Sequence, residues 1–151
     1  MTTTDYRPPD HNTVSPYLVV HGVPGLLEFV RHTFGAQELH RSATPDGRVR
    51  HAEARIGDTV IMMGEATAEF PVRPAMLHVY VPDVDAVYRR AVEAGAISLR
   101  EPADQFYGDR TGGVQDAFGN QWWMATHKED VSDEEIARRM GGGALTQLRH
   151  A

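Results

Sequence analysis

The chain has 151 residues and a formal net charge of −6, a length that suits one domain or two small modules sharing a core. It contains no cysteine, which excludes disulfides, thiolate catalysis and cysteine-ligated metal sites and is compatible with a cytoplasmic location. The acidic balance disfavours nucleic acid and anionic membranes as partners, and no apolar run is long enough to span a bilayer.

Residues 13–66 are predicted to form a first module with the order strand, helix and three strands. The β-branched stretch Val14–Val20 favours a strand, and the apolar spacing in Pro24–Phe34 favours a helix that ends at Gly35. Turn residues then separate three expected strands, at Ala36–Ser42, Val49–Ile56 and Thr59–Met63. The polar residues 1–12 are expected to be a flexible tail.

Residues 75–127 are predicted to repeat this order after a proline-containing linker at 67–74. Expected here are a strand at Met76–Val81, a helix at Asp83–Ala94 that stops at Gly95, a strand at Ile97–Arg100, a glycine-rich loop and a hairpin. Two similar segments at this spacing indicate a duplicated module. The fold class is therefore α+β, with two βαβββ modules.

A third helix is predicted at 128–140, before a tail at 141–151. Ser132 and Glu135 have the spacing of a capping box, and Arg138 and Arg139 suit the end of a helix. Two positions for this helix stay open, on a neighbouring subunit or on the surface of its own domain.

The hairpin at the end of the second module carries both tryptophans of the chain. Its turn is Asp116–Asn120, where Gly119 and Asn120 accept positive φ at low cost. Because side chains alternate along a strand, Trp122 and Trp123 face opposite sides. One tryptophan is expected in the core, and the other is expected to line a cavity or an interface.

The loop Tyr-Gly-Asp-Arg at 107–110, the motif Asp-x-Phe-Gly-Asn-x-Trp from Asp116 and the trailing Ala-Thr-His-x-Glu-Asp-Val resemble the PhnB-like branch of the vicinal oxygen chelate superfamily. That group includes glyoxalases, bleomycin-resistance proteins and extradiol dioxygenases. The resemblance covers most of the chain. It implies a curved mixed sheet around a cleft, a homodimer, and a small molecule as the partner.

Metal-binding members of this superfamily take one ligand from the first and one from the last strand of each module. Carried over to this sequence, the first-strand positions fall on Pro16 or Tyr17 and on Met76. The last-strand positions fall near Met62 or Met63 and on Trp123. These residues are poor ligands for a hard divalent metal, so the usual metal site is expected to be absent, and with it any cofactor.

A displaced site is the alternative. His51, His78 and Glu65 are the candidate catalytic residues, as a histidine base or as ligands of a displaced divalent metal. The competing interpretation is that both histidines are ordinary strand residues hydrogen-bonded to their neighbours. The other histidines are assigned to the surface or to the tails.

The residues fit a metal-free pocket better, because small-molecule sites are mostly apolar with a few placed polar groups. Arg110 is expected either to clamp an anionic group or to pair with Asp109 or Asp116 and brace the loop. The alternative to a pocket is that the methionines and Trp123 are core residues. The predicted ligand-binding residues are Tyr17, Met63, Met76, Tyr107, Arg110 and Trp123.

Three functions follow from these observations. The first is a glyoxalase/bleomycin-resistance-like protein that binds a small organic molecule without metal in the cleft between its modules. The second is a lyase or isomerase acting on a small carbonyl or secondary-metabolite substrate. The third is a structural or regulatory subunit with a filled cleft.

Overall fold

A computed structural model describes residues 5–141, and the chain divides into two compact units. Unit 1 contains the chain up to Ala75 together with the turn Asp116–Asn120, and unit 2 contains the remainder. Each unit has one four-stranded mixed sheet, so the predicted α+β class with two βαβββ modules is confirmed. Among residues 5–141, no helix is long and apolar enough to cross a membrane.

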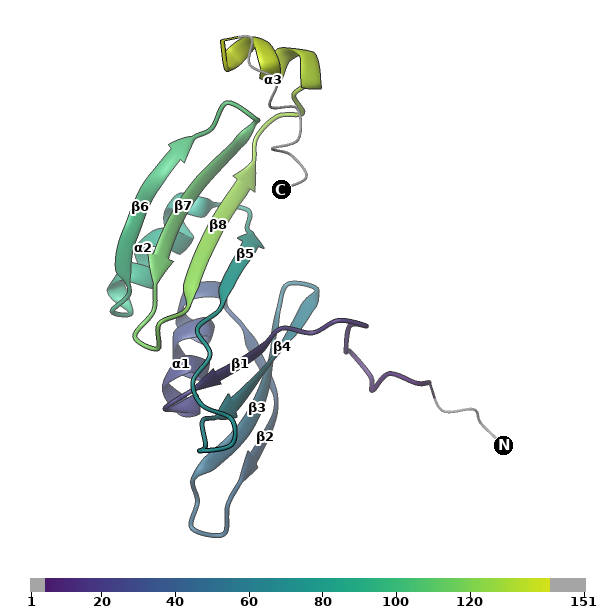
Figure 1. Ribbon diagram of the computed structural model, residues 1–151, viewed down its shortest axis with the longest axis vertical. Coiled ribbons are helices and arrows are strands. Elements are labelled where there is room, and N and C mark those ends of the chain that lie inside the picture. Colours follow the sequence, from purple (N-terminus) through teal and green to yellow (C-terminus); the bar gives the residue numbers. More distant parts are fainter. Residues whose placement is uncertain (1–4, 142–151) are drawn as a thin grey trace. The chain divides into compact units, whose positions relative to one another are not determined.

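Unit 1 contains a sheet with the strand order β1-β4-β3-β2 (Figure 1). Strands β1 and β4 are parallel, and the other pairs are antiparallel. Pro24 stands near the start of the helix and Gly35 caps its end in the left-handed conformation, as expected. The elements are β1 (Tyr17–Val20), α1 (Val23–Phe34), β2 (Gln37–Ala43), β3 (Val49–Ile56) and β4 (Thr59–Glu65).

Unit 2 repeats this topology with the strand order β5-β8-β7-β6 and adds a third helix (Figure 1). Besides shifts of one residue, three bounds differ from the prediction. The third helix spans only Asp133–Arg139 of the predicted 128–140. Strand β6 extends four residues beyond Arg100, and β7 absorbs the two glycines assigned to a loop, because both segments pair with each other across the sheet. The elements are β5 (Met76–Tyr80), α2 (Val84–Glu93), β6 (Ile97–Asp104), β7 (Asp109–Gln115), β8 (Gln121–His127) and α3 (Asp133–Arg139).

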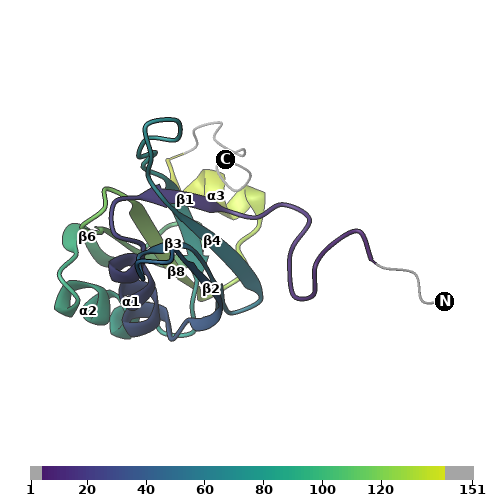
Figure 2. The same cartoon turned by 90° about the horizontal axis from the view of Figure 1, so that it is seen from below.

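Each sheet has one face covered by its own helix and an opposite face, which we call the free face. In unit 1, Leu18 and Met63 are cross-strand partners on the covered face, and both are fully buried. Figure 2 shows α1 lying along this sheet. In unit 2, Trp122 and Met124 are fully buried on the face that carries α2. Because side chains alternate, the neighbours of these residues project from the free faces.

The segment just before β1 is fixed to unit 1 by side-chain contacts. Asn12 accepts a hydrogen bond from the Val60 amide at 3.1 Å, and Asp10 pairs with Arg55 at 2.7 Å. The expectation of a flexible tail over residues 1–12 is therefore wrong for residues 10–12. Sequence patterns did not show this, because a short polar segment has no periodicity.

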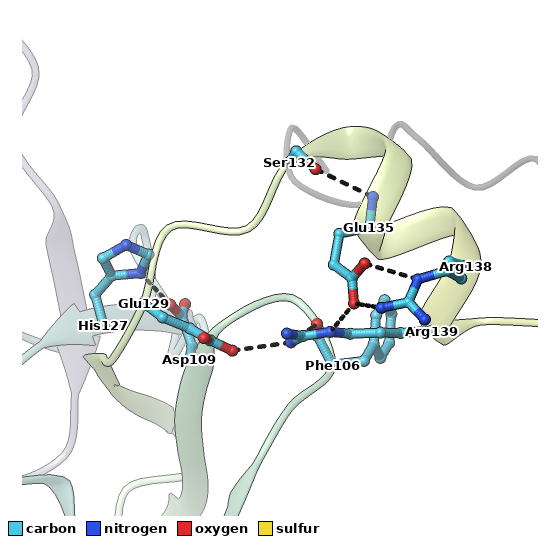
Figure 3. Close-up of polar contacts among 8 residues, drawn as sticks. All are labelled: Phe106, Asp109, His127, Glu129, Ser132, Glu135, Arg138 and Arg139. Carbon is cyan, nitrogen blue, oxygen red and sulfur yellow. Dashed lines mark hydrogen bonds and ion pairs between the residues drawn. The ribbon is translucent and has the colours of Figure 1, made fainter.

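The third helix packs on its own unit, through Ile136, which is 1% exposed. Ser132 caps it by accepting a hydrogen bond from the Glu135 amide at 3.1 Å, as predicted (Figure 3). Arg139 then donates to the Phe106 carbonyl oxygen at 3.1 Å and to Glu129 at 2.9 Å. Residues 142–151 of the expected tail lie outside the described residues.

Candidate functional site

The free face of unit 1 carries a chain of four hydrogen-bonded side chains. The Tyr17 hydroxyl lies 3.3 Å from Nδ1 of His51, and Nε2 of His51 lies 2.9 Å from Glu53. The other Glu53 oxygen lies 2.8 Å from Nε2 of His11, in the segment before β1. Strands β1 and β3 project Tyr17, His51 and Glu53 from the same face because they flank β4 in the sheet.

Hydrogen-bond partners determine the protonation states along this chain. Both ring nitrogens of His11 face acceptors, the Pro9 carbonyl oxygen at 2.9 Å and the Glu53 carboxylate. A ring with two acceptors must carry two protons, so His11 is an imidazolium. Glu53 accepts from Nε2–H of His51 as well, which leaves Nδ1 of neutral His51 as a lone pair facing the Tyr17 hydroxyl.

The perturbed pKa values agree with this assignment. The pKa of His11 is raised, first by the hydrogen bond to Pro9 and then, against some desolvation, by Glu53. Burial acts to raise the pKa of Glu53, but the hydrogen bonds that it accepts from His51 and His11 outweigh it, so the pKa is lowered. Glu53 is thus a carboxylate with both oxygens in use. Among residues 5–141, no group of three or more His, Asp or Glu is arranged to hold a metal ion.

Glu65 lies away from these residues, on the covered face of the unit 1 sheet. Its carboxylate accepts the backbone N–H groups of Gly22 at 3.0 Å and Val23 at 3.1 Å, and so caps the start of α1. A carboxylate at a helix N-terminus is stabilised by the helix dipole. The predicted combination of His51 with Glu65 is therefore wrong, because alternation along β3 and β4 puts them on opposite faces. The described structure places His78 in the other unit.

The free face of unit 2 centres on Trp123. Its ring lies flat over Gly113 of the neighbouring strand, where an added Cβ would come within 2.5 Å of the ring carbons. The indole N–H donates to Gln121 at 3.1 Å, and the Arg100 guanidinium carbon lies 5.5 Å from the ring centroid. Trp123 is half-buried, whereas Trp122 is fully buried on the opposite face. The expectation that one of the two tryptophans lies in the core is therefore confirmed for Trp122.

Strand β5 adds three exposed side chains to this face. Met76 is 70% exposed and Tyr80 is 64% exposed, with the His78 ring 4.9 Å from that of Tyr80. Their alternation with Leu77 and Val79 follows the strand period. Trp123, Met76 and His78 therefore share one surface, which brings together two of the predicted ligand-binding residues and one predicted catalytic residue.

Three other predicted ligand-binding residues lie elsewhere. Met63 is fully buried in the core of unit 1, so the alternative of a core residue holds for it. Arg110 lies on the covered face of unit 2, where it pairs with Asp85 at 2.9 Å and Asp104 at 3.3 Å. Those carboxylates raise the pKa of Arg110 further above its usual value. Tyr107 packs edge-on against Phe106.

Arg110 thus braces its unit, one of the two roles predicted for it, but through different partners from Asp109 and Asp116. Asp85 lies 25 residues earlier in the chain and approaches Arg110 only because α2 covers β7. Asp116 instead holds the hairpin turn by accepting the Phe118 and Asn120 amides at 2.8 and 2.9 Å.

A cluster that the sequence did not predict lies around buried Asp109. One of its oxygens accepts a hydrogen bond from Nδ1 of His127 at 2.6 Å (Figure 3). The other accepts a hydrogen bond from the Tyr80 hydroxyl at 3.1 Å. The other ring nitrogen of His127 lies 2.7 Å from Asp130. His127 is therefore an imidazolium between two carboxylates. This ion cluster fixes the segment that leads into α3.

The surface role predicted for His127 is thus incomplete, because the cluster joins the end of β8 to the start of β7. A cavity of about 260 Å³ lies beside it, lined by Asp104, Gln105, Gly108, Asp109, Lys128 and Glu129. The available signal was the Asp-Arg pair at the start of β7, for which the sequence left open an anion clamp by Arg110 or an ion pair that braces the loop.

The stability of unit 2 is expected to fall as pH rises, because of His127. The hydrogen bonds that His127 donates to Asp109 and Asp130 raise its pKa above the unfolded value of about 6.5. A raised folded pKa gives stabilisation that is complete below the unfolded pKa and disappears as pH passes the folded pKa. Urea unfolding from about pH 6 to pH 8 should show this decline.

His11 contributes a decline of the same sign, because its pKa is raised as well. His127→Gln should therefore remove the His127 contribution to the decline of the unfolding free energy with pH, and the His11 contribution should remain. Asp130→Asn should reduce the pH dependence contributed by His127, because only the pair with Asp109 remains. An unchanged slope in His127→Gln would contradict the assignment of a charged His127.

Comparisons with known proteins identify the family and the fold of this chain. The family model for the "Glyoxalase/Bleomycin resistance protein/Dioxygenase superfamily" covers residues 10–124. An uncharacterized protein of Mycobacterium tuberculosis is 34% identical over 138 residues, which cover 84% of this chain and 81% of that protein.

Three solved structures share the fold, although their low identity carries nothing beyond the fold. TioX of Micromonospora sp. ML1 has a TM-score of 0.62 at 22% identity and covers 76% of this chain and 98% of its own. A PhnB protein of Bacillus cereus has a TM-score of 0.63 at 16% identity, with 76% and 99% covered. The fosfomycin resistance protein FosX of Mesorhizobium loti has a TM-score of 0.58 at 16% identity, with 93% and 98% covered.

Proposed function

The chain belongs to the glyoxalase/bleomycin resistance protein/dioxygenase superfamily, and from this premise we propose that it binds a small organic molecule on the free face of unit 2 without a metal ion. The observation that carries this proposal is the flat Trp123 ring over Gly113. A tryptophan held in this way offers one broad apolar face on which a planar molecule can stack.

The polar groups around Trp123 indicate the chemistry of the ligand. The exposed Arg100 lies over the Trp123 ring, with its guanidinium carbon 5.5 Å from the ring centroid, so a planar ligand would enter between the two, where the guanidinium can pair with a carboxylate or sulfonate. His78 adds a second polar group beyond the ring. Buried Thr111, on the same face, has a hydroxyl oxygen with no hydrogen-bond partner among the described residues. A planar aromatic anion is therefore the favoured ligand class.

The residues at the metal positions of the superfamily support a metal-free site. Tyr17, Met62, Met76 and Trp123 provide no pair of nitrogen or carboxylate donors for a divalent ion. His51 has its Nε2–H committed to Glu53, and Glu65 is committed to the start of α1. We therefore derive no chemical step through a metal.

Binding can be measured with 8-anilinonaphthalene-1-sulfonate, an anion with a planar naphthalene ring system, as the probe. We expect the probe to quench Trp123 emission in the folded protein. Trp123→Ala should weaken binding by roughly tenfold, which corresponds to the loss of about 1.4 kcal/mol of aromatic contact. Arg100→Gln should weaken it severalfold, because one charged contact is lost.

Two controls accompany this measurement. Trp123→Phe keeps an aromatic ring at this position and leaves fully buried Trp122 as the sole emitter, so binding to this variant is read from the fluorescence of the probe itself. Dialysis against EDTA should leave binding unchanged. Binding that is lost on chelation and restored by one equivalent of a divalent metal would contradict the metal-free proposal, and equal binding by Trp123→Ala would contradict the site.

A further inference from the structure

Unit 1 contains a second set of polar side chains that the Trp123 face does not use. The Tyr17, His51 and Glu53 chain ends at the solvent, since Tyr17 is 52% exposed. Along it, burial increases, with side-chain exposures of 24% for His51 and 13% for Glu53. We propose that this chain is an acid-binding site, which takes up a small phenol or enol and holds it as its anion, with the proton stored on His51.

Hydrogen bonds determine which nitrogen of His51 carries the proton. His11, as a doubly protonated ring, keeps Glu53 a carboxylate, and Glu53 keeps the neutral His51 proton on Nε2. The lone pair on Nδ1 therefore faces outward, to the Tyr17 hydroxyl. Nδ1 of His51 can therefore accept one proton, and it lies next to the Tyr17 hydroxyl on the free face.

The proton transfer balances without any further reactant. A ligand O–H group donates its proton to the Tyr17 oxygen, while the O–H bond of Tyr17 breaks and its proton forms an N–H bond at Nδ1 of His51. The ligand becomes an oxyanion that accepts a hydrogen bond from the new Tyr17 O–H. The resulting His51 imidazolium is already paired with Glu53 at 2.9 Å, so the new charge is compensated.

The position of Tyr17 favours an aromatic or enolic ligand. Its ring lies over Gly64, where an added Cβ would come within 2.7 Å of the hydroxyl oxygen and 2.9 Å of a ring carbon. The hydroxyl is thus held close to the sheet, near His51. Half-buried Met62 on the neighbouring strand adds an apolar surface for the body of the ligand. The polar side chains around His51 include Tyr17, Glu53, the cross-strand partner Ser42, and His40, whose ring lies 6.2 Å away.

The probe for this site is 3-nitrophenol, because its phenolate is yellow and its phenol is nearly colourless. The intact chain is titrated with dye at about pH 7.5, which is above the ordinary histidine pKa of about 6.5. We expect a phenolate band beyond that of dye in buffer. We also expect almost no net release of protons to the buffer, because His51 retains the proton.

Variants separate this transfer from simple binding. Tyr17→Phe keeps the ring over Gly64 and removes only the hydroxyl, so the phenolate band should fall to the level of dye in buffer. His51→Gln should have the same effect. His40→Gln, on the same face and hydrogen-bonded to Ser42, is the matched control and should ionise the dye as the unmodified protein does. Circular dichroism checks that each variant is folded.

Three outcomes would overturn the proposal. They are no phenolate band up to the solubility limit of the dye, an unchanged band in folded Tyr17→Phe, or release of one proton to the buffer for each dye ionised. Because 3-nitrophenolate is itself a planar aromatic anion, the same titration of Trp123→Ala shows how much of the band comes from the other unit. None of the three outcomes affects the Trp123 face, since the two sites lie in different units and that face is read with 8-anilinonaphthalene-1-sulfonate.

Discussion

Gly108→Ala is expected to destabilise the protein by about 3 kcal/mol or more, as the sum of two effects. Gly108 has a φ of 104°, where an L-residue pays about 1–2 kcal/mol. In addition, an ideal Cβ would lie 2.2 Å from the Glu129 carbonyl oxygen, a contact with backbone that no side-chain rotation can relieve. The measurement is the free energy of unfolding in urea.

Gly95→Ala provides the control. Gly95 has a φ of 99°, close to that of Gly108, but an added Cβ meets nothing within 4 Å. It should therefore show the backbone cost alone, about 1–2 kcal/mol. The difference between the two variants isolates the contact with Glu129. Equal destabilisation would mean that the segment after β8 moves away from Gly108 at no cost.

This contact explains why a glycine stands between Tyr107 and Asp109. The Gly108 carbonyl oxygen accepts the amides of Lys128 at 2.8 Å and Glu129 at 3.2 Å, so the chain after β8 lies directly on it. The same segment carries Asp130, which pairs with His127. The loop motif that the sequence assigned to ligand binding therefore fixes the path into α3.

The alternation of side chains was enough to predict part of both free faces. It separated Trp122 from Trp123 and put Met76 and His78 on one face, because a strand has a period of two residues whatever its partners. The same rule would have separated Glu65 from His51. Once β4 is known to pair with β3, their positions lie on opposite faces.

Contacts between distant segments could not be predicted in this way. Arg110 finds Asp85, and His11 finds Glu53 at a separation of 42 residues, because the fold brings their elements together. His11 lies in a segment without periodicity and His127 is the last residue of β8, and the sequence assigned both to the tails or the surface. Their protonation follows only from which acceptors face each ring nitrogen.

Gly113→Ala and Gly64→Ala are expected to disable one site each and leave the other intact. In each case the added Cβ occupies the space of an aromatic ring, Trp123 over Gly113 or Tyr17 over Gly64. Gly113→Ala should weaken binding of 8-anilinonaphthalene-1-sulfonate by about tenfold, because the ring must leave its position on the sheet. Gly64→Ala should abolish the ionisation of 3-nitrophenol by moving the Tyr17 hydroxyl away from His51.

Neither variant should unfold the protein. Alanine in a strand gains roughly 0.5–1 kcal/mol over glycine, which offsets part of an overpacking cost of about 1–3 kcal/mol. Both clashes are with side chains that can rotate outward to the solvent, unlike the backbone contact at Gly108. Loss of function at near-normal stability would therefore locate each effect at one ring.

Each glycine variant is also tested with the probe of the other site. Gly113→Ala should ionise the phenol as the unmodified chain does, and Gly64→Ala should bind the naphthalene sulfonate normally, because the two glycines lie in different units. If either variant lost both activities, the two faces would form one functional site. If neither variant lost any activity, the aromatic rings held over the glycines would have no role in binding.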